Sequence, residues 1–423
     1  MVNFLSFAQF FSSWYAIVVY LIVLLALIGL LIAFLMVGES KAPKIVQADG
    51  ELPQQTKTEP KRTNRRRFDG LCRIDEEKTR YAGGEFNERI GLKEFCETFR
   101  DYAAGKLRLY YEIEDIRRFI AGMAVSHILI LQGMSGTGKT SLAFAFGEFL
   151  GNTSTVIPVQ PMWKERTDLI GYYNEFTKRF NETDLLKKIY EANYSEQIYI
   201  TVLDEMNIAR VEYYFAEFLS LLELPNAEER LLTVVSDEWK NDPKQLKDGH
   251  VRLPENMWFI GTANNDDSTF AISDKVYDRA MVLDLDKKAQ AFSAERPEGV
   301  KITAKRFKEL VKEAQEDYGL TERNRRRLRQ LDDFMTEHFR VTFGNRIRYQ
   351  IERYVPAYVA CGGEELNALD DILAKKVMRK LGMQNPVYLR NNAENLCRYM
   401  DELFGEENLS QCKEIVRRLG RSA

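Results

Sequence analysis

The sequence predicts an α/β fold, in which a parallel sheet flanked by helices is followed by an all-helical C-terminal part and preceded by one N-terminal transmembrane helix. Three observations predict this arrangement. Between residues 110 and 290, short apolar segments of strand length alternate with helical segments. Residues 303–419 alternate apolar and charged positions at helical spacing, with few Pro or Gly. Residues 15–37 contain no charged side chain.

The first predicted strand, ILILQ at residues 128–132, leads into the loop GMSGTGKT, and a helical stretch follows through Leu150. Strand, G-x-x-x-x-G-K-T loop and helix in this order predict a phosphate-binding loop. The glycines let backbone N–H groups turn toward phosphate oxygens, and the helix N-terminus adds a positive dipole end. Lys139 is expected to contact the β- and γ-phosphates. The predicted nucleotide-binding residues are Gly133, Met134, Ser135, Gly136, Thr137, Gly138, Lys139, Thr140, Ser141 and Asp204.

Three further strands carry the rest of the predicted site. IYITVL at 198–203 is followed by Asp204 and Glu205. Asp204, with the Thr140 hydroxyl, is expected to hold Mg²⁺, and Glu205 to orient and polarise the attacking water. MWFIGTAN at 257–264 ends in Asn264, which is expected to position water. MVLDL begins at residue 281, just after Arg279. The carboxyl ends of parallel strands share one edge, so we expect the ligand there.

Three strings point to a family. LDEMNIARVEYYFAEFLSLLE (203–223), PVQPMWKERTDLIGYYNEFTKRF (158–180) and FIGTANNDDSTFAISDKVYDRA (259–280) resemble the McrB-like branch of the AAA+ proteins, near the MoxR group. The likeness covers residues 110–290 well and residues 300–385 more loosely, as a helical lid. It implies a P-loop nucleoside triphosphatase that forms a homo-oligomeric ring, most often a hexamer.

The resemblance also implies residue roles. Asn264 looks like the sensor-1 residue, and Arg279 like an arginine finger that reaches a neighbour's nucleotide. Arg346, in FGNRIRYQIERY, is similar to the lid's sensor-2 arginine, with Arg348 as the alternative. The ordinary alternative for each arginine is a surface ion pair, which is worth little.

The sequence departs from the family at one string. Founding McrB proteins read Asn-Thr-Ala-Asp-Arg-Ser at sensor 1, whereas this chain reads NNDDST from Asn264, with Ser268 in place of the arginine. Those proteins favour GTP. No guanine-reading Asn-Lys-x-Asp string occurs here, although that branch never relied on one. The departure makes ATP the expected nucleotide and GTP the alternative. The family's DNA-reading domain is also missing, which weakens the case for nucleic acid as a partner.

The apolar run at 15–37 is long enough, at about 1.5 Å per residue, to cross a hydrocarbon core of roughly 30 Å. Aromatic residues precede it, and residues 39–67 carry more Lys and Arg than Asp and Glu. A cleaved signal peptide or a buried core helix fits less well. We therefore expect a single-pass protein of the bacterial inner membrane, with its N-terminus outside, its ATPase domain cytoplasmic, and membrane lipid as a partner.

This organisation divides the chain into six predicted parts. They are a transmembrane anchor (1–38), a basic flexible linker (39–67), a short helical segment (68–109), the ATPase core (110–290), the helical lid (300–385) and a C-terminal helical extension (386–423).

Composition excludes other classes. The net charge of −3 argues against a generic nucleic-acid binder. The five cysteines show no CxxC spacing and the three histidines are far apart, so neither a disulfide framework nor a His/Cys metal site is expected. The arginine-rich run at 323–329 could meet nucleic acid, lipid or a neighbouring subunit, although a solvated helix face is commoner. Trp163, Tyr172 and Tyr173 either line a pore or pack within the subunit.

Three functions fit these expectations. The first is a ring ATPase that remodels or translocates a protein or nucleic acid at the inner membrane face, in a defence or restriction-like system with a separately encoded effector. The second is a nucleotide-gated scaffold with slow turnover. The third is a DNA-translocating GTPase subunit of a nuclease. The apparently complete hydrolytic set of Glu205, Asn264 and Arg279 favours the first over the second.

Overall fold

The computed structural model describes residues 21, 24–28, 66–78, 85–264 and 269–421, and the chain divides into two compact units after Lys61. In the first unit, Leu21 and residues 24–28 are helical and exposed. The rest of the predicted membrane span at 15–37, and the linker through residue 65, lie outside the described residues. Among the helices that are described, none has both the length and the apolar character that crossing a bilayer requires.

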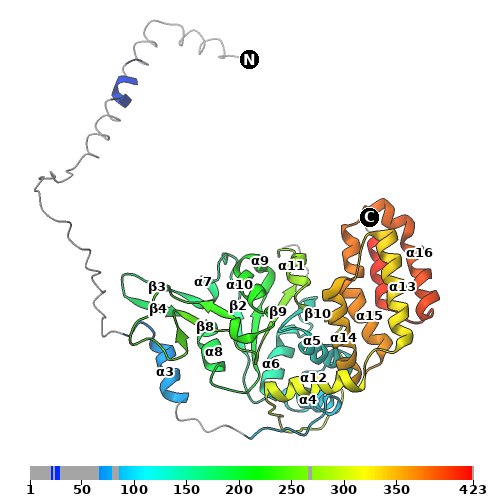
Figure 1. Cartoon of the computed structure of the whole chain (residues 1–423), viewed down its shortest axis with the longest axis horizontal. Helices are drawn as coiled ribbons and strands as arrows, with labels where there is room; N and C mark the ends of the chain where they lie inside the picture. Colours follow the sequence, from blue (N-terminus) through cyan, green and yellow to red (C-terminus); the bar gives the residue numbers. More distant parts are fainter. Residues whose placement is uncertain (1–20, 22–23, 29–65, 79–84, 265–268, 422–423) are drawn as a thin grey trace, which may run out of the picture. The chain divides into compact units, whose positions relative to one another are not determined.

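The second unit is built on a parallel five-stranded sheet (Figure 1). Its strand order is β10-β1-β9-β5-β2, and all four pairings are parallel. The strands are β1 (Ile128–Gly133), β2 (Thr155–Pro158), β5 (Tyr199–Asp204), β9 (Met257–Asn264) and β10 (Met281–Asp284). The predicted parallel sheet is confirmed, and the sequence-predicted strands around residues 128, 198, 257 and 281 all belong to it.

Helices cover both faces of this sheet, as parallel sheets require. Successive residues of a strand point to opposite faces, so Leu129 and Leu131 join one apolar cluster while Ile128 and Ile130 join another. The first cluster contains α4 (Leu92–Leu107), α5 (Ile113–Val125), α6 (Lys139–Phe149) and the C-terminal helices. The second contains α3 (Asp69–Lys78), α8 (Asp184–Ala192), α9 (Val211–Tyr214) and α10 (Ala216–Leu221).

Two small antiparallel sheets interrupt the core. The hairpin of β3 (Gly171–Asn174) and β4 (Arg179–Glu182) follows the short helix α7 (Thr167–Ile170). The strands β6 (Leu231–Thr233), β7 (Leu246–Lys247) and β8 (His250–Arg252) form a sheet of order β6-β8-β7. The single-turn elements η1 (Met206–Ile208), η2 (Ala227–Glu229) and α11 (Asp274–Tyr277) complete the core.

Arg67, at the end of the predicted linker, is buried, with 2% of its surface exposed. Its guanidinium forms a two-pronged pair with Asp242, at 2.8 and 2.6 Å, donates to Asp237 at 2.8 Å, and lies over the Trp239 ring. Residue 67 therefore belongs to the folded unit rather than to a flexible linker, because its partners from the β6–β7 connection hold it in place.

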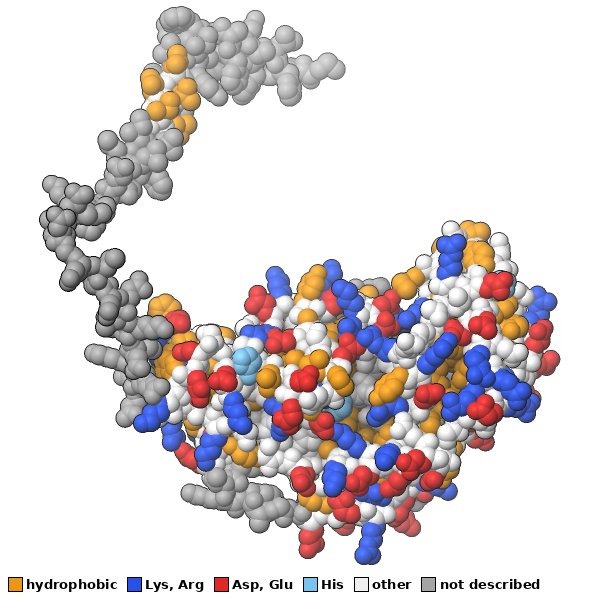
Figure 2. Space-filling view, viewed as in Figure 1, with side chains coloured by type: hydrophobic (Ala, Val, Ile, Leu, Met, Phe, Trp, Pro, Cys, Tyr) orange, Lys and Arg blue, Asp and Glu red, His pale blue; other side chains and the backbone are white. Residues whose placement is uncertain are grey.

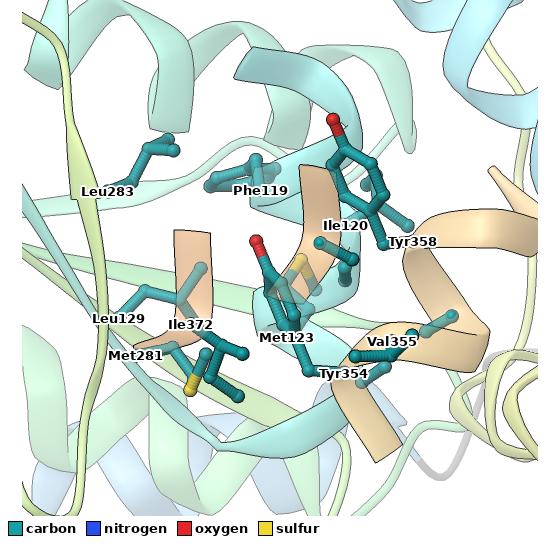
Figure 3. Packing of buried hydrophobic residues seen from close by; sticks show 14 of the residues in the cluster. Phe119, Ile120, Met123, Leu129, Met281, Leu283, Tyr354, Val355, Tyr358 and Ile372 are labelled. Carbon is teal, nitrogen blue, oxygen red and sulfur yellow. The ribbon is translucent and has the colours of Figure 1, made fainter. Parts of the chain in front are cut away.

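The C-terminal part is entirely helical within the described residues, as predicted. Its elements are α12 (Ala304–Asp317), α13 (Glu322–Phe339), α14 (Gly344–Ala360), α15 (Glu365–Lys376), η3 (Met378–Met383), α16 (Pro386–Phe404) and α17 (Ser410–Arg421). The last two helices pack on α13, α15 and η3. The lid meets the core where Tyr354, Tyr358 and Ile372 lie beside Phe119 and Met123 of α5 (Figure 3).

Candidate nucleotide site

The glycine-rich loop joins the end of β1 to the start of α6. Gly133 and Gly136 have φ angles of 142° and 80°, in a backbone region that residues other than glycine rarely adopt. A Cβ on Gly133 would also stand 2.5 Å from the carbonyl oxygen of Leu285. Met134 and Ser135 are exposed on the curve of the loop, Thr137 is half-buried, and Ser141 lies in the first turn of α6. This backbone is the cradle that a phosphate chain needs at a helix N-terminus.

Lys139 starts α6 and is 7% exposed. Its ammonium donates to the carbonyl oxygens of Met134 at 2.7 Å and Gly133 at 3.1 Å, so the charge lies within the curve of the loop. Burial lowers the pKa of Lys139, while the nearby carboxylates, Asp286 and Asp204 among them, oppose that shift. A cation held there by desolvated backbone is suited to bind the β- and γ-phosphates of a nucleotide.

A carboxylate at the end of β5 lies directly beside this loop. The hydroxyl of Thr140 donates to Asp204 Oδ1 at 2.6 Å, and the hydroxyl of Thr262, on β9, donates to the same oxygen at 2.8 Å. The Thr262 hydroxyl also accepts the backbone N–H of Glu205 at 2.9 Å. One hydroxyl group thus orients Asp204 and fixes the backbone of Glu205. A hydroxyl and a carboxylate are the oxygen ligands that Mg²⁺ takes in such sites, so Thr140 and Asp204 fit that ion.

Glu205 has a left-handed backbone, with φ 53° and ψ 47°, and its side chain is exposed. A non-glycine residue in that conformation is uncommon, and such residues cluster at functional sites. The conformation places its carboxylate outside the sheet, immediately after the residue that faces Thr140. This position is suited to a group that polarises a water molecule next to the phosphates.

Asn264 ends β9 and pairs in register with Gly133, so it lies at the same edge of the sheet as the loop. Its carbonyl oxygen accepts the side-chain amide of Asn207 at 2.9 Å and the hydroxyl of Thr269 at 3.0 Å. The structure therefore brings Asn264, Asp204 and Glu205 together, as the strand order requires. Ser268, in the departing string, lies outside the described residues.

The two candidate arginines lie elsewhere, and they lie together. Arg279 Nε is 2.8 Å from one oxygen of Glu223, and Arg346 Nη2 is 2.5 Å from the other. Arg348, the alternative to Arg346, instead pairs with Asp332 inside the lid at 2.7 Å. The structure thus groups Arg346 with Arg279 and separates it from Arg348.

This arginine pair is far from the glycine-rich loop of its own chain. The carbonyl of Arg279 accepts the hydroxyl of Ser126, which precedes β1, whereas the loop begins at Gly133, where β1 ends. The six-residue strand between them spans about 20 Å at about 3.3 Å per residue. Arg279 also turns its side chain to Glu223, so its guanidinium does not face its own site.

The remaining candidates show ordinary packing. The ring centroids of Trp163 and Tyr214 are 5.6 Å apart, and those of Tyr173 and Trp239 are 6.1 Å apart. Tyr172 is half exposed. In the arginine-rich run, Arg325 pairs with Glu352 at 3.2 Å. Positive and negative side chains are interspersed over the face in Figure 2. Among the described residues there is no cluster of three or more His, Cys, Asp or Glu side chains that could hold a metal.

Sequence reasoning missed three residues at these sites. Thr262 lies inside a strand, and only the β5–β9 pairing reveals its contacts. Tyr111 lies just before the start of α5, and its hydroxyl donates to the carbonyl oxygen of Gly138 at 3.1 Å. Glu223 follows α10, and its role depends on where the lid sits. Thr262 could have been suspected, because it stands two residues before Asn264 in a strand adjoining the site.

Residues 128–280 match the AAA domain family, dynein-related subfamily. The chain is a P-loop ATPase. The matched residues include the glycine-rich loop, the Asp204–Glu205 pair and Arg279. No curated protein matches the sequence.

Solved structures also resemble the chain, and two of them illustrate the likeness. One is a candidate ATPase of Cytophaga hutchinsonii, 16% identical, covering 77% of this chain and 97% of that one at a TM-score of 0.46. The other is a full-length MCM homologue of Methanopyrus kandleri, 11% identical, covering 66% and 58% at a TM-score of 0.37. Both likenesses are too weak to bear on function.

Proposed function

We propose that this ATPase is a ring-forming, membrane-anchored member of the McrB-like branch of AAA+ proteins, in which each nucleotide is hydrolysed between two subunits. The observation that carries this proposal is the separation of Arg279 from the glycine-rich loop of its own chain. An arginine that stabilises the charge developing on the γ-phosphate must approach it closely. Arg279 can do so only from a neighbouring subunit, and a closed ring, with a hexamer the most common form, supplies such a neighbour at every site.

Each residue at the loop has a role in this reaction. Lys139 and the loop N–H groups bind the phosphates, while Thr140 and Asp204 hold Mg²⁺, which neutralises charge on the β- and γ-phosphates. Glu205 takes or orients the proton of the attacking water, and Asn264 holds that water in line. We favour ATP over GTP, because the string that begins at Asn264 departs from that of the GTP-favouring McrB proteins and no guanine-reading string occurs in the sequence.

The membrane location rests on the uncharged segment at 15–37. A bilayer-spanning anchor there, followed by basic residues, would place the AAA domain on the cytoplasmic side of the bacterial inner membrane. By its resemblance to this branch, the ring would remodel or translocate a protein or nucleic-acid partner. It would do so together with a separately encoded effector in a defence system. Washing membranes with alkaline carbonate should leave the full chain in the pellet. Its release into the soluble fraction would exclude the anchor.

A slow, nucleotide-gated scaffold is the second candidate, and turnover distinguishes the two. Lys139→Ala should abolish nucleotide binding, whereas Glu205→Gln should bind nucleotide and Mg²⁺ but not hydrolyse it. Calorimetric binding and phosphate release from detergent-solubilised full chain measure both. A wild-type protein that assembles with ATP but releases no phosphate above the Glu205→Gln level would support the scaffold instead.

A further inference from the structure

The turn that carries Arg279 is held by side chains from other elements. Its four consecutive carbonyl oxygens, at residues 277–280, each accept a side-chain hydrogen bond. Lys376, the last residue of α15, donates to Tyr277 O at 2.7 Å and to Ala280 O at 2.5 Å. Gln350 of α14 donates to Asp278 O at 3.1 Å, and Ser126 donates to Arg279 O at 2.8 Å. Three of these four bonds come from the lid.

Charged contacts tie the same turn, and α11 just before it, to η3. Arg379 pairs with Asp274 at 2.7 Å and lies over the Tyr277 ring, with 4.1 Å from its guanidinium carbon to the ring centroid. Lys380 pairs with the Asp278 carboxylate at 3.3 Å. These two pairs touch side chains of the segment. Among the side chains that the structure describes, Lys376 alone donates to backbone carbonyls on both sides of Arg279.

Lys376 is also unusually buried for a lysine, with 2% of its surface exposed. Burial lowers its pKa to about 7. Placing an amine there is unfavourable unless its hydrogens are bonded, and an apolar side chain of equal length would carry no such penalty. Its two hydrogen bonds to the turn compensate for that burial, and the charge of the nearby Asp278 also favours the ammonium form.

We propose that Lys376 is the positioning residue for Arg279: it joins the lid and the Arg279 turn into one body, so that a movement of the lid is relayed to the arginine offered to the neighbouring subunit. The lid also supplies Arg346, which pairs with Glu223 next to Arg279. The inference rests on the proposed action of Arg279 between subunits, and it adds the element that controls where that arginine points.

The test uses Lys376→Met in the full chain, because methionine keeps the length of the side chain and removes its donors. Nucleotide affinity should match wild type, since the glycine-rich loop is untouched. The kcat should fall about 10- to 100-fold, as expected when a catalytic group is displaced by about 1 Å. Lys413→Met is the matched control: it is also a buried lysine of the C-terminal helices, but it donates to Asp401 and to the carbonyl oxygen of Glu406 rather than to the Arg279 turn, and its replacement should change kcat by less than about twofold.

Mixed rings separate a positioning role from general damage. Lys376→Met mixed with Glu205→Gln should regain activity, because the first supplies an intact site and the second an intact Arg279 turn. Lys376→Met mixed with Arg279→Ala should show no such recovery. If Lys376→Met fails to fold, Gln350→Met, which removes the single bond to Asp278 O, should show the same pattern more weakly.

The outcomes distinguish this inference from the proposed function. Wild-type kcat in Lys376→Met, beside an inactive Arg279→Ala, would overturn the positioning role and leave the shared site intact. Verified mixed rings of Lys376→Met and Glu205→Gln that stay inactive, where Arg279→Ala and Glu205→Gln recover, would place the role of Lys376 in its own subunit's site. Wild-type kcat in Arg279→Ala would overturn the proposed function itself.

Discussion

Arg279 of the core and Arg346 of the lid bind the two oxygens of one carboxylate, that of Glu223. Two guanidinium groups on a single carboxylate leave a net positive charge, partly exposed, at the end of the sheet away from the glycine-rich loop. Such a fork is suited to receive an anion from another subunit. Glu223 keeps the two like charges together before that anion arrives.

Glu223→Gln should therefore lower turnover without weakening nucleotide binding. The amide keeps the shape of the side chain but removes the charge that holds the arginines, which then repel each other. We expect kcat to fall about tenfold, equivalent to about 1.4 kcal/mol in the barrier. Steady-state phosphate release beside a binding titration measures both quantities. Glu217→Gln, on the same segment but paired with Arg166, is the control. Faster turnover than wild type would mean that Glu223 holds the arginines back.

Thr262→Val should lower both turnover and stability, although Thr262 lies inside β9. Valine matches threonine in shape but cannot donate to Asp204 or accept the N–H of Glu205. The unbonded N–H should lower the free energy of unfolding by about 1–3 kcal/mol. The kcat should fall and the Mg²⁺ concentration for half-maximal rate should rise, because Asp204 loses one of its orienting donors. Kinetics across a Mg²⁺ series, with thermal unfolding, measure these effects.

Thr201→Val provides the matched comparison for that variant. Thr201 is equally buried on β5, and its hydroxyl has no hydrogen-bond partner among the residues that the structure describes. Its replacement should leave kcat unchanged and stability equal or higher. Equal losses of activity in both variants would show that any change in the sheet disturbs the site.

Arg67→Met should destabilise the folded unit although it lies far from the nucleotide site. Arg67 and Asp242 are both buried, and removing one partner of such a pair leaves an uncompensated charge, which costs about 3 kcal/mol or more. Thermal unfolding of the detergent-solubilised chain should show a clear fall in Tm. Arg66→Met, which removes an exposed pair with Glu76, should not change Tm. Equal Tm values for both variants would show that the Arg67 contacts add nothing.

The sequence predicted the parts of the site that are local along the chain. The loop 133–140 with its flanking strand and helix, and the strand that ends in Asp204, are contiguous patterns, so their placement at one edge follows from the parallel sheet. Thr262 could not be assigned, because its contacts depend on the register between β5 and β9. Glu223 and Lys376 each make contacts between the core and the lid. These contacts depend on how the lid is oriented, and no local sequence pattern encodes that orientation. Arg67 was assigned to a linker because its acidic partners come about 170 residues later.

The most direct test of the shared site is complementation between two inactive variants. Arg279→Ala keeps Lys139, Thr140 and Asp204, so it should bind nucleotide nearly normally and fail to turn over. Glu205→Gln keeps Arg279 but lacks the group that polarises water. Co-expressed in mixed rings, the two should recover part of the wild-type rate of phosphate release, because some interfaces then pair an intact Glu205 with an intact Arg279. Verified mixed rings without recovery, or monomeric protein that hydrolyses at the full rate, would contradict the account.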